Sequence, residues 1–321
     1  MTRRKGPKRG RKVMHIIAII VAFVVVVNLV SLAINQLGFR HELDGRQPYG
    51  ELVTVDGRNM HVYSMGHGSR TVVLLPGLGV PLPSADFGPL MRALSGTYTV
   101  VCVEFFGVGF SDQTDSPRTN ENYVQEIRSA LSVAGFAPPY VLMPHSASGI
   151  YSEFYASVYP QEVSAIIMLD TTSSAKTEAE VPGFVYGLSK VQQAIGLARF
   201  VNPLIVKSTL GLTEQNGYTT REIADYTAFM NHGTNDTTID QMTRFNDNIR
   251  EVMGMRFPNT IPVLELASSE TVKRMGETYE TDHLEKLGTD ARLTIIDGNH
   301  FVYHGAVQQI VDATDSFLRD A

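Results

Sequence analysis

Short segments that are apolar at nearly every position place the strongest constraint on the fold of this chain. They include residues 71–75 (TVVLL), 98–103 (YTVVCV) and 163–169 (VSAIIML). A strand of this kind must be covered on both faces, as in a parallel sheet packed between helices. With 321 residues, of which 43% are hydrophobic, the chain can bury a large core around such a sheet.

Eight segments have the length and composition of strands, and helix-like segments separate most of them. The first two alternate apolar and polar residues across Asp56-Gly57, which predicts an antiparallel hairpin at the edge of the sheet. We therefore predict the α/β class, with a mostly parallel eight-stranded sheet and right-handed crossovers. The expected strands are 52–55, 60–64, 71–75, 98–103, 140–143, 163–169, 262–267 and 293–296.

Residues 172–258 interrupt this alternation. They contain helix-like pieces at 183–200, 220–231 and 237–254, and no convincing parallel strand. We interpret them as a helical cap inserted over the carboxyl edge of the sheet, where it would exclude water and shape a substrate pocket.

The amino terminus combines a basic tail with a long apolar segment. Residues 1–12 hold seven Lys and Arg residues and no acid, and residues 13–34 are almost wholly apolar. A helix of these 22 residues is about 33 Å long, close to the thickness of a bilayer core. The pattern predicts a cytoplasmic tail (1–12), a transmembrane signal anchor (13–37) and an extracytoplasmic domain (38–321) at the cell membrane.

A cleaved signal peptide is the alternative for the same segment. Ser31-Leu32-Ala33 offers the small residues that a signal peptidase requires, and cleavage there would give a secreted protein. The length of the apolar segment favours a retained anchor, with the lipid bilayer as the partner of residues 13–37.

Charge and cysteine content exclude several classes of function. Residues 13–321 carry 20 basic and 33 acidic residues, so an acidic domain follows the basic tail and nucleic acid is not the expected partner. Cys102 is the only cysteine, which excludes an internal disulfide and a Cys-x-x-Cys metal or redox pair. We expect neither a metal nor a cofactor.

The strongest local signal is YVLMPHSASGIY at residues 140–151, where a strand leads directly into a turn and then a helix. A serine in such a turn projects above the sheet as a nucleophile, and the N–H of Ala147 would face a developing oxyanion. Glycine usually occupies the positions two before and two after the serine, but here they are Pro144 and Ser148. The alternative role for Ser146 is to cap the following helix.

Four segments in the order of the chain resemble the α/β-hydrolase superfamily of esterases, lipases and aminopeptidases, and more narrowly bacterial serine hydrolases with a Pro-His-Ser-x-Ser-Gly turn. The resemblance covers residues 49–320. It rests on LLPGLG (74–79), VEFFGVGFSD (103–112), PHSASG (144–149) and DGNHFVYH (297–304). It implies the α/β-hydrolase fold, with Ser146 as nucleophile and His300 as general base. The oxyanion hole would be formed by the N–H groups of Leu78 and Ala147.

The acid that orients His300 is less certain from the sequence. In the family it usually follows the strand matched by residues 262–267, where Glu270 is the carboxylate closest to the expected position. Asp170, at the end of strand 163–169, is the alternative, since some α/β-hydrolases carry the acid there. We favour Glu270 at this stage.

The resemblance implies a serine hydrolase, esterase-like or lipase-like, that cleaves a carboxylic ester, a thioester or a small amide through an acyl-enzyme. Its partner would be a small-molecule acyl substrate. Two alternatives share the fold. One is a non-catalytic binding protein, and the other is a triad enzyme that is not a hydrolase, such as a lyase or a cofactor-free haloperoxidase.

Overall fold

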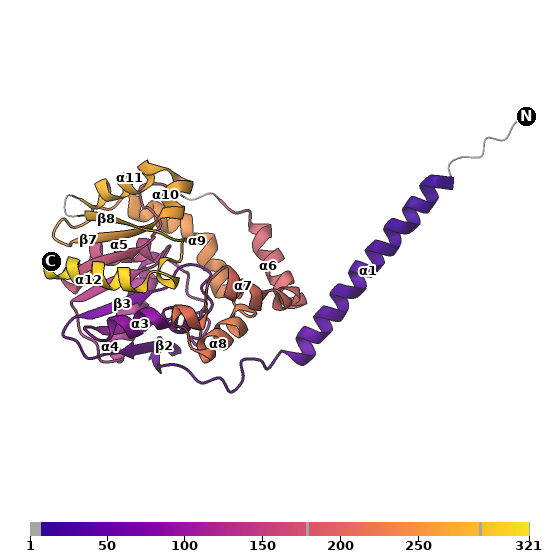
Figure 1. Cartoon of the computed structure of the whole chain (residues 1–321), viewed down its shortest axis with the longest axis horizontal. Coiled ribbons are helices and arrows are strands. Elements are labelled where there is room, and N and C mark those ends of the chain that lie inside the picture. The colour runs from indigo at the N-terminus through magenta and orange to yellow at the C-terminus, as the bar shows by residue number, and fades with distance from the viewer. Residues whose placement is uncertain (1–7, 178–179, 289–290, 321) are drawn as a thin grey trace, which may run out of the picture.

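The computed structural model describes residues 8–177, 180–288 and 291–320. Figure 1 shows a central sheet covered by helices, with the long helix α1 extending away from it. Residues 1–7 of the predicted basic tail lie outside the described residues.

The eight strands form one sheet in the order β1-β2-β4-β3-β5-β6-β7-β8. The pairs β1–β2 and β2–β4 are antiparallel and all the other pairs are parallel, which confirms the predicted fold class and the edge hairpin. The strands are β1 (Glu51–Val55), β2 (Arg58–Met65), β3 (Thr71–Leu75), β4 (Thr99–Val103), β5 (Tyr140–Pro144), β6 (Val163–Leu169), β7 (Val263–Ser268) and β8 (Ala291–Ile296).

Helices cover both faces of the sheet, as the fully apolar strands require. Alternate residues of β3 show the pattern: Val73 and Leu75 pack with α4 and α5, whereas Val72 and Leu74 pack with α3 and α12. The helices outside the cap and α1 are α2 (Pro83–Asp86), α3 (Gly88–Leu94), α4 (Asn120–Val133), α5 (Ser148–Val158), α10 (Ser269–Met275), α11 (Glu277–Leu287) and α12 (Val307–Asp320).

The direction in which the chain adds strands to the sheet reverses after β3, and a crevice is expected at this point. β3 lies between β4 and β5, so the chain leaves β3 toward one side and leaves β5 toward the other. Loops diverge at such a switch point, and ligands of open α/β sheets bind outside the carboxyl ends of the strands there. The loop 76–79 and the turn 145–147 both lie at this point.

The segment between β6 and β7 is helical in its described residues, as predicted for the cap. Its longest helices are α6 (Gly183–Ile195), α8 (Thr220–Met230) and α9 (Asp236–Met253), with α7 (Asn202–Ser208) between the first two. Tyr226 and Phe229 of α8 pack against Val80 and Leu82, so the cap shares a small core with the loop after β3. α9 also packs on α5 and closes one face of the main core.

The helix α1 (Lys8–Gly38) is long and apolar enough, over Lys12–Gly38, to cross a membrane. Its side chains in this span are almost entirely uncovered by the rest of the chain. A core helix would be buried, so this helix requires another apolar surrounding.

Candidate active site

Ser146 lies in the tight turn between β5 and α5 with a φ of +53°, a left-handed conformation that is uncommon for a residue with a side chain. The neighbouring strands hold this turn in place. His145 N–H donates to the carbonyl of Leu75 (2.9 Å), and Ser146 N–H donates to the carbonyl of Leu169 (3.2 Å). The backbone is thus anchored to β3 and β6 at once, which offsets the cost of the strained conformation.

Close packing around the turn explains the residues on either side of it. A Cβ atom on Gly77 would lie 2.8 Å from Cβ of Ser146, and one on Gly149 would lie 2.7 Å from Cβ of Thr171. Ser148, at a position where glycine is usual, is buried and donates its hydroxyl to the carbonyl of Pro76. Gly149 therefore permits the close approach to β6, and Ser148 fixes the turn to the loop after β3.

His300 lies in the loop between β8 and α12, and it contacts two of the residues considered from the sequence. Its Nε2 is 2.9 Å from Oγ of Ser146, and its Nδ1 is 2.6 Å from Oδ2 of Asp170. The imidazole side chain is 33% exposed, whereas Asp170 is buried. A carboxylate, an imidazole and a hydroxyl are therefore connected in series, with the hydroxyl at the end nearest solvent.

The prediction from the sequence that Glu270 is the acid that orients His300 was wrong. Glu270 is exposed on the first turn of α10, and its backbone N–H donates to the carbonyl of Gly298. The carboxylate beside His300 is that of Asp170, the alternative considered from the sequence. The reason is that α10 begins at Ser269, which directs the Glu270 side chain toward solvent.

Asp170 is held by more hydrogen bonds than its contact with His300. It has a φ of +48°, and its carboxylate accepts from the N–H of Ser268 (2.5 Å) and from the hydroxyls of Ser268 (3.0 Å) and Thr271 (2.7 Å). Such donors stabilise an ionised carboxylate in a buried position. The end of β7, where the sequence suggested an acid, instead supplies the groups that position the acid at the end of β6.

Backbone N–H groups of Leu78 and Ala147 border the same space. Neither N–H donates a hydrogen bond to any of the residues that the structure describes. Both residues line a pocket of about 390 Å³ together with Ser146, His300 and Asp170. Two unpaired donors at the base of a pocket can receive an oxygen that becomes negatively charged.

Comparison with known proteins agrees with this architecture. The family model for the alpha/beta hydrolase fold matches residues 70–250, which is more than half of the chain. The chain belongs to the α/β-hydrolase fold family. The match to the family model ends before His300, so the loop that carries this histidine is identified by its geometry and not by the match.

Relatives of this α/β hydrolase are distant. YbdG of Bacillus subtilis (strain 168) is 27% identical over 84% of this chain and 86% of its own length. Pimeloyl-[acyl-carrier protein] methyl ester esterase of Xanthomonas axonopodis pv. citri is 29% identical over 44% of this chain and 51% of its own. The crystal structure of Cfl2 from Burkholderia cenocepacia, 17% identical, superposes with a TM-score of 0.66 over 83% of this chain and 95% of its own. The structural likeness shows the fold alone.

His145, beside the serine of this α/β hydrolase, has a structural environment that differs from that of His300. Its Nε2 donates to the carbonyl of His300 at 3.1 Å, and burial lowers the pKa of His145 well below its ordinary value, with a further contribution from the charge of His300. The ring therefore stays neutral and fixes the loop that carries His300. His304, the other nearby histidine, is bound to the buried carboxylate of Asp86 at 2.9 Å.

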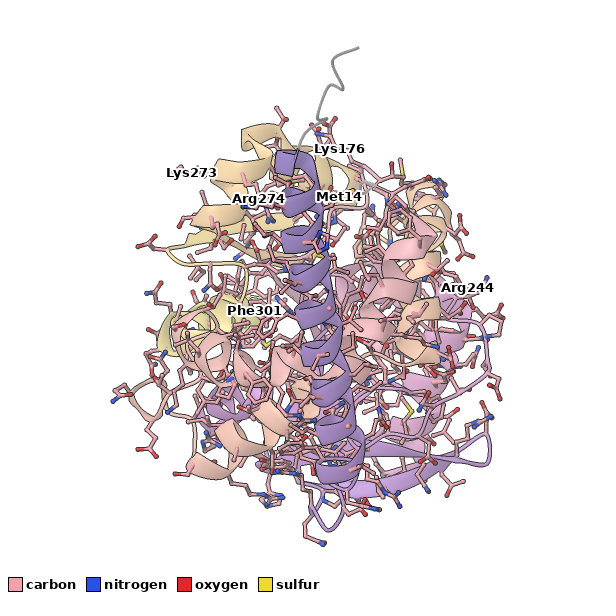
Figure 2. All side chains as sticks on the ribbon, turned by 90° about the vertical axis from the view of Figure 1, so that its right-hand side faces the viewer. Met14, Lys176, Arg244, Lys273, Arg274 and Phe301 are labelled. Carbon is pink, nitrogen blue, oxygen red and sulfur yellow. The ribbon has the colours of Figure 1, made fainter. Side chains whose placement is uncertain are left out.

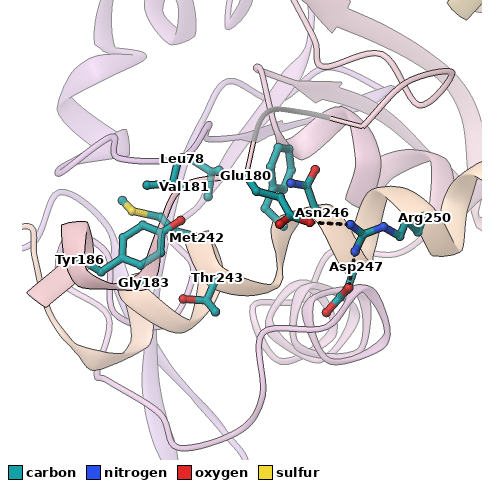
Figure 3. Close-up of a pocket in the computed structure, with 11 residues that line it drawn as sticks. Leu78, Glu180, Val181, Gly183, Tyr186, Met242, Thr243, Asn246, Asp247 and Arg250 are labelled. Carbon is teal, nitrogen blue, oxygen red and sulfur yellow. Dashed lines mark hydrogen bonds and ion pairs between the residues drawn. The ribbon is translucent and has the colours of Figure 1, made fainter.

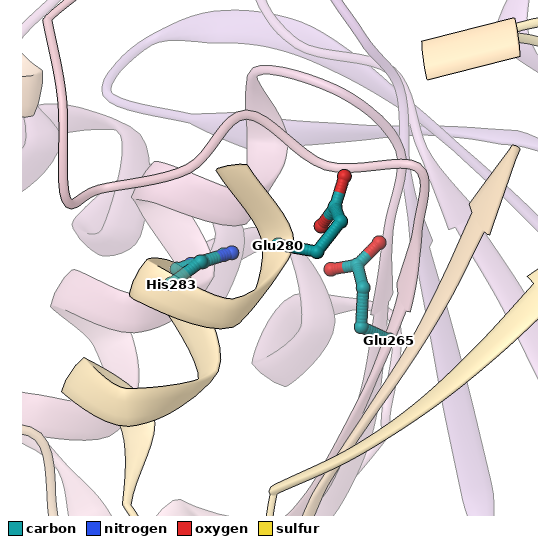
Figure 4. A group of neighbouring side chains, drawn as sticks. All are labelled: Glu265, Glu280 and His283. Atoms are coloured by element: carbon teal, nitrogen blue, oxygen red, sulfur yellow. The ribbon is translucent and has the colours of Figure 1, made fainter. Parts of the chain in front are cut away.

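Behind the acid lies a buried cluster that the sequence did not suggest. Glu265 on β7 accepts hydrogen bonds from the N–H (3.1 Å) and hydroxyl (2.8 Å) of Thr171, and Figure 4 shows it beside Glu280 and His283 of α11. One ligand atom from each of these three side chains lies within 4.8 Å of the others, a donor set that suits a divalent cation. The spacing of Glu280 and His283 on one helix face was the only signal in the sequence.

Burial favours the protonated form of both carboxyl groups in this cluster. Burial, together with the charge of Glu280, raises the pKa of Glu265 well above its ordinary value. Burial raises the pKa of Glu280 to about 7, opposed by the charge of His283 and assisted by that of Asp170. Both carboxyl groups can therefore remain protonated where an ordinary glutamate is ionised.

The raised pKa of Glu280 predicts a pH-dependent stability. A folded state that holds this proton up to about pH 7, while the unfolded chain loses it near 4.5, becomes less stable as the pH rises through that interval. Glu280→Gln removes the titration. We expect the difference in unfolding free energy, Glu280→Gln minus parent, to increase from pH 5 to pH 8. Thermal unfolding of both proteins at each pH measures this difference. Equal changes in Glu280→Gln and in the parent would contradict the raised pKa, and the exposed Glu270→Gln serves as the control.

Proposed function

We propose that this protein is a serine hydrolase that cleaves a carboxylic ester, a thioester or a small amide through an acyl-enzyme. The observation that carries the proposal is the series of contacts from Asp170 through His300 to Ser146, at 2.6 and 2.9 Å. A base within hydrogen-bond reach of a serine, itself oriented by a carboxylate, is the arrangement by which proteins activate this hydroxyl.

Each group has a role in the proposed reaction. His300 Nε2 takes the proton of Ser146 as Oγ attacks the carbonyl carbon, and the imidazolium then gives that proton to the leaving group. Asp170 accepts from Nδ1–H of His300, which fixes the tautomer and stabilises the imidazolium. The N–H groups of Leu78 and Ala147 receive the carbonyl oxygen as it becomes negatively charged. A water molecule, activated by the same histidine, then releases the acyl group.

One relative supports an ester as the substrate class. The Xanthomonas relative is named as a methyl ester esterase, although the match spans about half of that protein. The nucleophile here is a serine, so the covalent intermediate is an acyl ester of Ser146. The cap helices above the pocket would exclude competing water and select the acyl group.

We also propose that residues 13–37 are retained as a membrane anchor, with the basic tail in the cytoplasm and the catalytic domain outside. Two contacts of the described structure support retention over cleavage near Ser31-Leu32-Ala33. Ser31 is buried and donates to the carbonyl of Ile195 (2.8 Å), and Asn35 donates to the carbonyl of Ala194 (2.9 Å). Cleavage after Ala33 would remove the first contact and leave Asn35 at a free chain end.

The anchor predicts that the mature protein keeps the mass of all 321 residues and stays with the membrane fraction after a high-salt wash. Intact mass spectrometry of the purified membrane form checks this. A product lighter by ~3–4 kDa, the mass of a released signal peptide, would contradict the anchor and leave the hydrolase proposal untouched.

The triad predicts different outcomes for two acidic residues. Asp170→Asn should lower kcat toward an activated ester by roughly 10³-fold to 10⁴-fold, because the histidine loses its oriented tautomer and the stabilisation of its charge. Glu270→Gln is the matched control, since Glu270 is exposed, and its rate should stay within about twofold of the parent. Steady-state kinetics measures both variants, and thermal unfolding verifies that each is folded. Equal rates for Asp170→Asn and the parent would refute this triad.

A further inference from the structure

An exposed apolar surface covers the part of the cap nearest α1. Fourteen exposed large apolar side chains follow α1 among the described residues, and eight of them lie between residues 181 and 204. We call these eight the cap apolar face: Val181, Phe184, Leu188, Val191, Leu197, Phe200, Val201 and Leu204. Its most exposed members are Phe184 (75%), Phe200 (68%) and Leu204 (66%). So dense an exposed apolar patch indicates a surface that is covered in the working protein.

The arrangement of α6 presents this surface in one direction. Phe184, Leu188 and Val191 follow at spacings of four and three residues, which places them on one side of the helix. All three are about half exposed or more, and no residue of α6 is buried. The described chain therefore leaves the apolar side of this helix largely uncovered.

The cap apolar face is continuous with α1. Ser31 and Asn35 of α1 donate side-chain hydrogen bonds to carbonyl groups of the last turn of α6, and Arg199 donates to the side-chain oxygen of Asn35 (2.9 Å). These bonds satisfy carbonyls that a helix end leaves unpaired. They hold the carboxyl end of α6 against the last turns of the apolar helix, so a bilayer that surrounds α1 also reaches the cap.

Positive charge accompanies this face. Figure 2 views the domain from the side on which α1 lies and shows Lys176, Lys273 and Arg274 on that side. Lys176 is paired with Asp282 at 3.0 Å, and Lys273 and Arg274 are exposed. An apolar surface and exposed cations on one side of the domain match the boundary between acyl chains and anionic headgroups.

A second cavity lies between the cap apolar face and the pocket that holds Ser146 and shares lining residues with each of them. It has a volume of about 600 Å³ and lies between the start of α6 and α9 (Figure 3). Leu78 and Phe245 line both this cavity and the pocket that holds Ser146. Val181, Tyr186 and Met242 gather with Leu78 on one side of it in Figure 3, so this side is suited to an apolar chain.

Polar groups occupy the other side of the cavity. Arg250 of α9 is paired with Glu180 (3.0 Å), which precedes α6, and with Asp247 (2.7 Å). All three side chains are at least half exposed, so these pairs contribute little stability and can separate. The apolar side includes Leu78, which also lines the pocket of Ser146, so this side is the one suited to a substrate tail.

We propose that the cap apolar face rests in the outer leaflet around α1, and that the second cavity receives the acyl chain of an amphipathic long-chain ester drawn from that leaflet. The inference rests on the proposed hydrolase activity and on the retained anchor. It specifies the substrate class: the ester carbonyl lies at Ser146 and the chain extends past Leu78 and Phe245. A second copy of this chain on the same face is the competing occupant.

Fluorescence quenching tests the membrane contact. The full-length protein, with a single cysteine introduced by Phe184→Cys, Leu204→Cys or Val133→Cys, is labelled with NBD and reconstituted in vesicles of phosphatidylcholine and phosphatidylglycerol. Cys102 is buried, which protects it from the dye. Val133, 59% exposed at the end of α4, is the control. Spin-labelled lipids should quench positions 184 and 204 by about half and leave 133 unchanged.

Two outcomes would overturn the membrane contact. One is equal and low quenching at all three positions. The other is a spectral change at 184 and 204 that increases with protein density in the vesicle and is insensitive to spin-labelled lipid, since that result identifies a second copy. Because quenching does not depend on catalysis, the same result is expected in a Ser146→Ala background.

A chain-length profile tests the acyl cavity. Met242→Trp fills its apolar side, and Met253→Trp makes the same change at an exposed position of the same helix. Relative to an acetyl ester, hydrolysis of a dodecanoyl ester should fall about tenfold or more in Met242→Trp and stay unchanged in Met253→Trp. An unchanged ratio in Met242→Trp would refute the cavity as the acyl site. If the parent itself hydrolyses no ester, the proposed function fails and the quenching result stands by itself.

Discussion

The left-handed turn at Ser146 is the constraint on which the rest of the site depends. Backbone hydrogen bonds to β3 and β6 hold this turn in place, and Gly77 and Gly149 leave room for it. The hydroxyl of Ser148 also donates to the carbonyl of Pro76. The same contacts bring the loop 76–79 beside the serine. One packing arrangement thereby creates the position of the proposed nucleophile and brings together the two N–H donors of the proposed oxyanion site.

Much of this organisation could be predicted from the sequence, because local composition determines it. Apolar runs such as residues 71–75 and 163–169 identify buried parallel strands, and the strand–turn–helix pattern at 140–151 identifies the turn at Ser146. The position of His300 came from the resemblance of residues 297–304 to the α/β-hydrolase superfamily. Each of these predictions needs only the pattern within one segment.

The acid could not be predicted in the same way, because its position depends on contacts among three strands. Asp170 reaches His300 since β6 lies next to β7 and since Ser268 and Thr271 donate to the carboxylate. A short helix beginning at Ser269 turns Glu270 outward. The buried cluster of Glu265, Glu280 and His283 was missed for a related reason: its members come from β7 and α11 and meet only in the folded chain.

The membrane segment and the cap are two parts of one proposed arrangement. Polar side chains at the end of α1 bind the carboxyl end of α6, and α6 borders a cavity that shares Leu78 and Phe245 with the pocket of Ser146. A substrate with one apolar chain and one ester group would use all of these features. Its chain would leave the bilayer beside the anchor, and its carbonyl would stop at the serine.

The central claim is that the Ser146 hydroxyl is an activated nucleophile. The most direct measurement is peptide mapping, by mass spectrometry, of the full-length protein after treatment with a fluorophosphonate, beside Ser146→Ala. Our account predicts a single covalent adduct on Ser146 in the parent and none in Ser146→Ala, because Oγ of Ser146 lies 2.9 Å from Nε2 of His300, the base that would activate it. An unmodified Ser146 in the folded parent, or an adduct of equal yield in Ser146→Ala, would contradict it.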